Sequence, residues 1–128
     1  MTILWKSAYE IGHEKIDAEH QQLFELINRF LAAEGQGALT MCAMSLFKYT
    51  REHFTHEEGL MRDIGYPSIR EHIQQHNDLL SELNHIAESI ANNTLDKSQL
   101  SAFLVPWLLN HIGKSDAELA GYLRLKEA

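Results

Sequence analysis

Apolar residues recur every three or four positions in four blocks of the chain, with no run that alternates every second residue. The blocks cover about residues 23–31, 46–64, 69–90 and 98–123. A repeat of three to four residues puts apolar side chains on one helix face, whereas a half-buried strand needs a repeat of two. The pattern therefore predicts an all-α protein with four amphipathic helices.

The segments between the blocks carry helix-breaking residues: Gly35 to Gly37, Gly65 with Pro67, and Asn92 with Asn93. Ser68 followed by Glu71 forms a capping-box pattern that predicts the start of the third helix. Pro106 lies inside the fourth block, where it removes one backbone hydrogen bond and predicts a kink.

Short connections between helices favour antiparallel neighbours, so the sequence predicts an up-down-up-down four-helix bundle. A length of 128 residues fits a single domain over 1–128 with one hydrophobic core. About 17 residues precede the first helix, and we expect residues 1–17 to form an N-terminal arm. The aromatic side chains of Trp5 and Tyr9 are expected to pack the arm on the bundle.

Charge and composition exclude several kinds of partner. The chain has 18 acidic and 11 basic residues, and no basic stripe that could neutralise phosphates. Nucleic acid and anionic membranes are therefore not expected to bind. No signal-peptide pattern is found, and the longest apolar run, 102–109, is too short to span a membrane. The single cysteine, Cys42, lies in an apolar run and predicts a buried thiol in a cytoplasmic protein.

Histidine is the residue type that suggests chemistry, since the chain has eight and four of them fall between positions 53 and 76. Short histidine motifs arise by chance, so spacing alone decides little. Position on the helices decides more, because six polar side chains interrupt the apolar stripes. At about 1.5 Å rise per residue all six lie at a similar depth in the bundle: His20, His53, Glu57, His72, His76 and His111.

A single buried histidine usually bonds to a backbone carbonyl or a water. Six polar groups that converge in one apolar interior must instead satisfy one another or bind something. Pairs four residues apart, such as His53 with Glu57, share one helix face and can address one ion. Six or seven ligands exceed the needs of one ion, which indicates two ions bridged by carboxylates. Nitrogen and oxygen ligands without thiolate suit iron or manganese better than structural zinc.

These residues resemble the hemerythrin family, specifically its stand-alone bacterial members, over nearly the whole chain. The matching motifs are W...Y..G...ID..H from Trp5 to His20, HF..EE..M....YP....H...H from His53 to His76, and W...HI...D from Trp107 to Asp116. The resemblance implies a non-heme di-iron site with a bridging oxo or hydroxo group. It implies one iron on His72, His76 and His111, the other on His20 and His53, and bridges from Glu57 and Asp116.

The resemblance also implies that the iron with two histidines keeps an open position, where dioxygen binds end-on. An apolar pocket would surround that position and hinder the water and protons that release peroxide. The residues that match this pocket are Phe54, Trp107, Leu108 and Ile112. Each of them is equally consistent with ordinary bundle core.

Spacing alone makes Asp116 an awkward ligand, because five residues from His111 is about 140° around an ideal helix. Glu118 returns to the face of His111 but lies roughly 10 Å further along the axis. We therefore follow the family in choosing Asp116 and expect a local distortion of the helix near Gly113.

Other ionisable residues near the motifs receive weaker assignments. His56 is the rival of His53 and is expected to be exposed or to support a ligand. Glu58 is expected to be solvated, and Glu19 to lie next to His20, where it tunes that ligand or has no effect. The histidines without a place in the pattern are expected on the surface: His13 and His85.

The leading hypothesis is reversible dioxygen binding by a carrier, store or scavenger that is not an enzyme. One alternative is a di-iron redox enzyme, such as a ferroxidase, a peroxidase or a protein that handles nitric oxide. Another is an oxygen or redox sensor that acts through a separate protein. The sequence indicates no specific protein partner.

Overall fold

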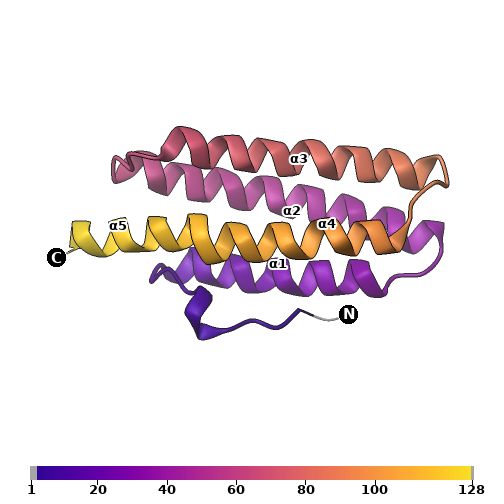
Figure 1. Ribbon diagram of the computed structural model, residues 1–128, viewed down its shortest axis with the longest axis horizontal. Helices are drawn as coiled ribbons and strands as arrows, with labels where there is room; N and C mark the ends of the chain where they lie inside the picture. Colours follow the sequence, from indigo (N-terminus) through magenta and orange to yellow (C-terminus); the bar gives the residue numbers. More distant parts are fainter. Residues whose placement is uncertain (1–2, 128) are drawn as a thin grey trace.

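Helices run the length of the chain in alternating directions (Figure 1). The computed structural model describes residues 3–127, and the side chains of 3–126. Residues 1, 2 and 128, which the predicted domain and arm include, lie outside the described residues. The main elements are α1 (Glu14–Ala32), α2 (Gln36–Asp63), α3 (Ile69–Ala91), α4 (Lys97–Asn110), η2 (His111–Asp116) and α5 (Ala117–Glu127). The predicted up-down-up-down bundle is confirmed, with α4, η2 and α5 forming its fourth rod.

The helix ends show which local signals operate. Gly65 has a φ of 66°, a conformation that glycine adopts without steric cost, and it turns the chain between α2 and α3. Asp96 caps α4 by accepting a hydrogen bond from the backbone N–H of Ser98 at 2.9 Å. The predicted capping box at Ser68 is wrong, because the Ser68 side chain makes no capping hydrogen bond. The backbone carbonyl of Ser68 accepts instead from the N–H of His72.

Two boundaries differ from the prediction. α1 begins at Glu14, four residues earlier than expected, because the His13 ring caps the helix by accepting from the N–H of Ile16 at 3.3 Å. α2 begins at Gln36, so that residue and Gly37 are helical rather than part of the breaker. α4 continues through Pro106 without a break in its helical residues; the kink stays a prediction.

The N-terminal arm lies along α1 (Figure 1) and is fixed at both of its ends. The Asn28 side chain exchanges two hydrogen bonds with the backbone of Ile3, at 2.8 and 2.9 Å. Trp5 and Tyr9 pack on Phe24 with ring centroids 5.3 and 5.6 Å away, as predicted. At the other end the Asp17 carboxylate accepts from two consecutive backbone N–H groups, those of residues 11 and 12.

The buried apolar side chains form two clusters. The larger one extends from Leu23 and Phe54 toward the α1–α2 and α3–α4 loops. The smaller one contains Ile16, Met61 and Leu119 at the opposite end. The polar residues selected from the sequence fall between these clusters on every helix, so they divide the core.

The outer face of α2 corrects one prediction. Cys42 is half-buried, not buried, because the buried stripe passes through Ala43 and Leu46 and leaves the neighbouring positions on the flank. Met41 and Met44 on this flank are 71% and 67% exposed. No helix among residues 3–127 combines the length and apolar character needed to cross a bilayer.

Candidate metal centre

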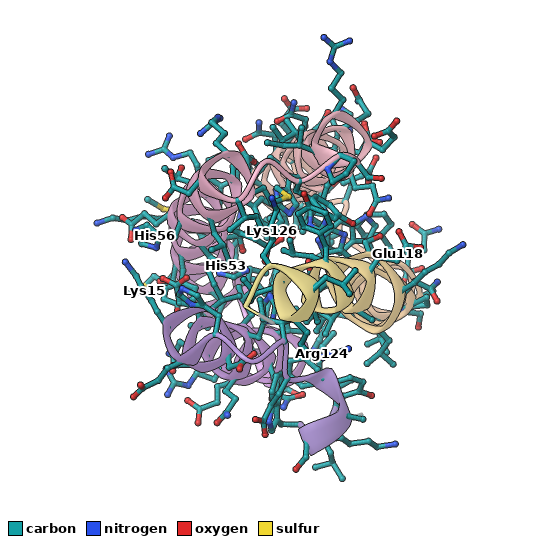
Figure 2. The ribbon with its side chains drawn as sticks, turned by 90° about the vertical axis from the view of Figure 1, so that its left-hand side faces the viewer. Lys15, His53, His56, Glu118, Arg124 and Lys126 are labelled. Carbon is teal, nitrogen blue, oxygen red and sulfur yellow. The ribbon has the colours of Figure 1, made fainter. Side chains whose placement is uncertain are left out.

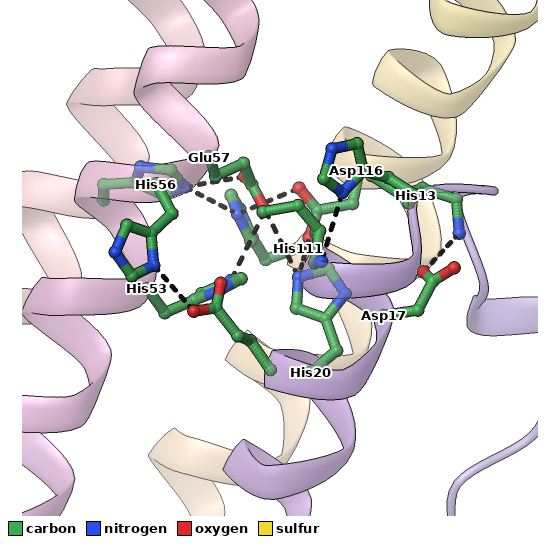
Figure 3. Close-up of polar contacts among 12 residues, drawn as sticks. His13, Asp17, His20, His53, His56, Glu57, His111 and Asp116 are labelled. Atoms are coloured by element: carbon green, nitrogen blue, oxygen red, sulfur yellow. Dashed lines mark hydrogen bonds and ion pairs between the residues drawn. The ribbon is translucent and has the colours of Figure 1, made fainter.

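Seven polar side chains from α1, α2, α3 and η2 meet at one level of the core (Figure 3). None of them is more than 5% exposed. They are the residues that the sequence singled out: His20, His53, Glu57, His72, His76, His111 and Asp116. The structure therefore brings the complete predicted set together.

Glu57 occupies the middle of this cluster and is fully buried. One carboxylate oxygen, Oε2, lies 3.2 Å from Nε2 of His20 and 3.4 Å from Nε2 of His53. The other, Oε1, lies 2.6 Å from Nε2 of His72 and 3.1 Å from Nε2 of His76. Each oxygen thus faces a different pair of histidines, an arrangement suited to a carboxylate that bridges two ions.

Asp116, like Glu57, contacts histidines of both sets. Its Oδ2 lies 3.2 Å from Nε2 of His20, and its Oδ1 lies 2.9 Å from Nε2 of His72 and 3.5 Å from Nε2 of His111. These contacts are close, yet neither oxygen accepts a well-directed hydrogen bond from any residue of the described part of the chain. The carboxylate is completely buried, so it needs another positively charged partner.

The helix containing Asp116 is distorted where the sequence required it. Residues His111–Asp116 form a π-helix, whose i to i+5 repeat brings Asp116 back to the face of His111. Gly113 lies within this segment, as expected. Glu118, the rival position, is exposed on α5 and is drawn on the outside of the bundle in Figure 2.

The residues fit a pair of metal ions. Ligand atoms of Glu57, His72, His76 and His111 lie within 4.8 Å of one another, as do those of His20, His53 and Glu57. Nε2 of His76 lies 3.2 Å from Nε2 of His111, so two nitrogens face each other inside an apolar core. Shared cations would satisfy these nitrogens together with both carboxylates. Nitrogen and oxygen ligands without sulfur suit iron or manganese.

Three of the histidines are held from outside the cluster through Nδ1. An imidazole that offers Nε2 to a metal carries its proton on Nδ1 and donates it to an outer acceptor, which orients the ring. The acceptors are Glu19 at 3.0 Å from His53, Glu58 at 2.9 Å from His76, and Gln75 at 2.8 Å from His111.

These contacts follow the order of the chain, since α1 holds a histidine of α2, α2 one of α3, and α3 one of η2. His20 on α1 precedes these three histidines in the chain and lacks such an acceptor within the described part of the chain. Its Nδ1 is buried and has no hydrogen-bond partner among the described residues.

Two predictions about the outer residues are wrong. Glu58 is not simply solvated, because its Oε2 bonds to His76, and Glu19 supports His53 rather than His20. Gln75 was missed altogether. The sequence did offer one signal, because Glu19, Glu58 and Gln75 each lie next to a predicted ligand in the sequence. Each of them, however, contacts a ligand on another helix.

The remaining histidines take ordinary roles. His56 is exposed, and its Nδ1 lies 2.6 Å from the second oxygen of Glu19, so it supports a ligand indirectly. His85 is exposed as expected and pairs with Glu82. His13 is only half-buried and caps α1, a role that the sequence reading did not assign.

The cluster shifts the pKa values of its members in opposite directions. Burial lowers the pKa of His20, but contacts with the Asp116 and Glu57 carboxylates outweigh it and raise the pKa to about 10. The same balance raises the pKa of His72 to about 9. For His111 burial prevails and lowers the pKa to about 4. Without metal at neutral pH, His20 and His72 are therefore protonated and His111 is neutral.

Both carboxylates are ionised. Burial raises the pKa of Glu57, but hydrogen bonds from four histidines lower it well below its usual value. Burial and the charge of Glu57 raise the pKa of Asp116, but His111 and His20 outweigh them, so that this pKa lies below its usual value. The cluster thus offers two ionised carboxylates to a metal, and their charges favour the protonated forms of His20 and His72 when no metal is bound.

An apolar cavity of about 20 Å³ borders the cluster. His20, His53 and His111 form its polar end, and His72 and His76 do not line it. All four predicted pocket residues belong to its wall: Phe54, Trp107, Leu108 and Ile112. The cavity also reaches beyond them toward the middle of the bundle, past residues that the sequence reading had placed only in the core: Leu23, Ile27, Leu46, Thr50, Leu79, Leu83 and Leu104.

Two aromatic rings of this wall stack directly on cluster histidines. Phe54 lies parallel to His76 with centroids 3.6 Å apart, and Trp107 lies over His111 at 4.6 Å. These rings shield the imidazoles and restrict their rotation.

Residues 11–123 match the protein family described as Hemerythrin HHE cation binding domain. This chain belongs to the hemerythrin family. Similar proteins include a myohemerythrin of Riftia pachyptila, 28% identical over 94% of this chain and 92% of that protein. A bacteriohemerythrin of Clostridium acetobutylicum is 27% identical over 90% and 96%. A bacteriohemerythrin of Pseudomonas aeruginosa is 30% identical over 90% and 77%.

The fold agrees with this assignment. A crystal structure of wild-type hemerythrin superposes with a TM-score of 0.86, at 22% identity, over 96% of this chain and 98% of that one. Membership of the family rests on the sequence match, and the superposition confirms the bundle.

Proposed function

We propose that this protein binds dioxygen reversibly at a non-heme di-iron centre and acts as an oxygen carrier, store or scavenger, not as an enzyme. The observation that carries the proposal is the juxtaposition of a two-sided ligand cluster with an apolar cavity. Its relatives are named myohemerythrin and bacteriohemerythrin. The single Cys42, which has no partner within the chain, supports a location in the cytoplasm.

We assign the ligands by the side of the cluster on which they lie. His72, His76 and His111 would hold one iron, and His20 with His53 the other. Glu57 and Asp116 would bridge the two ions, together with an oxo or hydroxo group. The division is supported by Glu57, whose two oxygens face the two sets of histidines separately.

The cavity favours the two-histidine side as the site of oxygen binding. Both of its histidines, His20 and His53, line the cavity, whereas only His111 does so on the other side. An iron with two histidines and two bridging carboxylates also has fewer ligands from the protein, which leaves a position for a small molecule. The bound pair of irons would supply two electrons that dioxygen takes up and returns.

The chain's own residues provide the conditions for reversibility. The apolar wall excludes the water and protons that would release reduced oxygen from the site. Phe54 and Trp107, which belong to this wall, stack on His76 and His111, so that the apolar surface is continuous with the histidine rings. Glu19, Glu58 and Gln75 fix ring orientation from outside, so the ligand geometry need not reorganise when dioxygen enters or leaves.

Metal analysis combined with anaerobic visible spectroscopy tests the proposal. Reduced protein should contain about two irons per chain and be colourless, become coloured in air, and fade again on deoxygenation through repeated cycles. Iron that oxidises irreversibly in air would replace the proposal with a catalytic function. A folded protein with zinc or no metal would overturn the di-iron centre.

A further inference from the structure

Gln75 is the one amide among the three side chains that orient ligand histidines from outside the cluster. Glu19 and Glu58 are carboxylates, and either oxygen of a carboxylate can accept the proton of an imidazole Nδ1. An amide has only one accepting end, because its nitrogen carries two protons and accepts none. Gln75 therefore supports His111 only when its oxygen, and not its nitrogen, faces the ring.

The Gln75 oxygen accepts from a second donor that belongs to the same helical segment as His111. The Ser115 hydroxyl on η2 lies 2.6 Å from Oε1 of Gln75, and Nδ1 of His111 lies 2.8 Å from the same atom. A separation of 2.6 Å is typical of an O–H group that donates to oxygen, whereas bonds between N–H and oxygen measure about 2.7–3.2 Å. The short contact thus favours the orientation in which the amide oxygen faces both residues.

The Ser115 contact differs from those of other hydroxyls within the helices of this chain. Ser89 on α3 donates to the backbone carbonyl of His85 at 3.0 Å, and Thr40 and Thr55 on α2 make the same kind of contact. Such a bond to the carbonyl four residues earlier is common for serine and threonine in a helix. The Ser115 hydroxyl instead reaches from η2 to α3, where it orients a side chain of the other helix.

The orientation of the amide decides which nitrogen of His111 is free for a metal. Nε2 of His111 faces the cluster, 3.2 Å from Nε2 of His76 and 3.5 Å from Oδ1 of Asp116. With the Gln75 oxygen at Nδ1, the neutral ring carries its proton there and keeps a lone pair on Nε2. A reversed amide would donate to Nδ1 and leave the proton on Nε2, the atom that has to bind the metal.

We propose that Ser115 is a positioning residue for the His111 ligand and acts through Gln75. Its hydroxyl holds the amide oxygen toward Nδ1 of His111, so that the imidazole offers Nε2 to the metal. This role rests on the proposed function, because it requires His111 to be a metal ligand. A side chain that is not a ligand, and does not bond to one, thereby influences metal affinity.

Ser115→Ala tests this role in an anaerobic competition for ferrous iron between the protein and a chelator. Loss of an outer partner of a metal ligand lowers affinity by about 10–100-fold, and we expect Gln75→Leu to fall in this range. S115A acts one contact further out and should lower the affinity by about three- to tenfold. Ser89→Ala is the matched control, because it removes a hydroxyl that bonds within its own helix, and it should leave iron affinity unchanged.

The double variant S115A/Q75L separates an effect through Gln75 from a general effect on the π-helix. If Ser115 acts through Gln75, the double variant should bind iron as tightly as Q75L alone, because the contact is already lost. Ser115→Thr keeps the hydroxyl and should retain the affinity of the wild type. If S115A fails to fold, Ser115→Cys, whose thiol is a weak donor, replaces it with the same expectations.

Wild-type iron affinity in S115A would overturn the role of Ser115. A further loss when S115A is added to Q75L would also overturn it, since the hydroxyl would then act without Gln75. So would a loss in S115T equal to that in S115A. Dioxygen takes no part in these measurements, so a protein that follows these predictions but oxidises irreversibly in air would contradict only the proposed function.

Discussion

At the scale of single residues, the centre depends on charged side chains that bond to the ligand histidines and are not ligands themselves. Glu19 is the clearest case, because one oxygen bonds to His53 and the other to the exposed His56. A carboxylate on Nδ1 increases the electron density that the imidazole offers through Nε2, and this stabilises a ferric ion more than a ferrous one.

We predict that Glu19→Gln raises the midpoint potential of the di-iron centre by about 30–60 mV, since ~59 mV corresponds to a tenfold change in relative affinity for a one-electron couple. The amide keeps a hydrogen-bond acceptor for His53 but removes the charge. Spectroelectrochemical titration measures the shift. Glu52→Gln is the control, because Glu52 is an exposed acid next to His53 on α2. Equal potentials for both variants would show that Glu19 acts only by packing.

The protonation of the empty cluster leads to a second prediction at this scale. A metal binds neutral imidazole, so loading must remove the protons that the raised pKa values of His20 and His72, about 10 and about 9, retain at pH 7. Metal affinity should therefore increase with pH up to about pH 10 and weaken as the pH falls. Calorimetric titration with ferrous ion in buffers of different ionisation heat counts the released protons. A release well below one proton per chain at pH 7 would contradict the assigned protonation.

The sequence allowed the cluster residues to be predicted because each interrupts a helical apolar stripe, a property that is visible within one helix. The outer partners could not be found in this way. Glu58 and Gln75 lie on positions that look solvated on their own helices, and their acceptor role depends on how neighbouring helices are packed.

At the scale of the elements, η2 shows how a local departure from α-helical geometry serves a single side chain. The i+5 spacing of His111 and Asp116 conflicted with an ideal helix, and this conflict in the sequence correctly predicted a distortion. The start of α1 was harder to predict, because a histidine cap is a weaker signal than serine or aspartate.

The arm offers a test at this scale. Asp17→Ala removes the acceptor for two backbone N–H groups, the buried one of Ile11 and the partly buried one of Gly12. We expect the free energy of unfolding to fall by about 1–3 kcal/mol, the cost of leaving such groups unpaired. Urea denaturation followed by tryptophan fluorescence measures it, since Trp5 reports on the arm. Asp78→Ala, at an exposed position whose carboxylate accepts from Gln74, should change stability by less than about 0.5 kcal/mol. Similar losses in both variants would argue against a role for Asp17 in anchoring the arm.

At the scale of the whole molecule, a polar layer separates two apolar clusters. Without metal, this layer buries two carboxylates and five imidazoles, two of them protonated, so that charged groups are held away from water in the middle of the core. Metal binding therefore contributes to the stability of the entire bundle.

We predict that removing the metal lowers the melting temperature by at least about 10 °C, since a few kcal/mol in a domain of this size corresponds to such a shift. Differential scanning calorimetry of chelator-treated protein measures the change. Adding ferrous ion should restore stability, whereas calcium, which prefers a cage of oxygen ligands, should not. Recovery with calcium would show that charge alone, without imidazole coordination, stabilises the core.

The bundle topology followed from the four apolar blocks and short loops, because both signals are local. The extent of the cavity could not be predicted from the sequence, since it depends on gaps among side chains of several helices. The apolar pattern of a single helix does not reveal such gaps.

The succession of outer acceptors along the chain has a consequence for protein engineering. Exchanging α2 alone with a relative would place a foreign helix opposite Glu19 on α1, and would remove Glu58, the acceptor that His76 on α3 uses. Helices of this bundle are therefore not interchangeable parts. A functional chimaera has to transfer α1, α2 and α3 together, with its junctions in the loops outside this unit. A graft of one helix has to be accompanied by matching substitutions on both neighbouring helices.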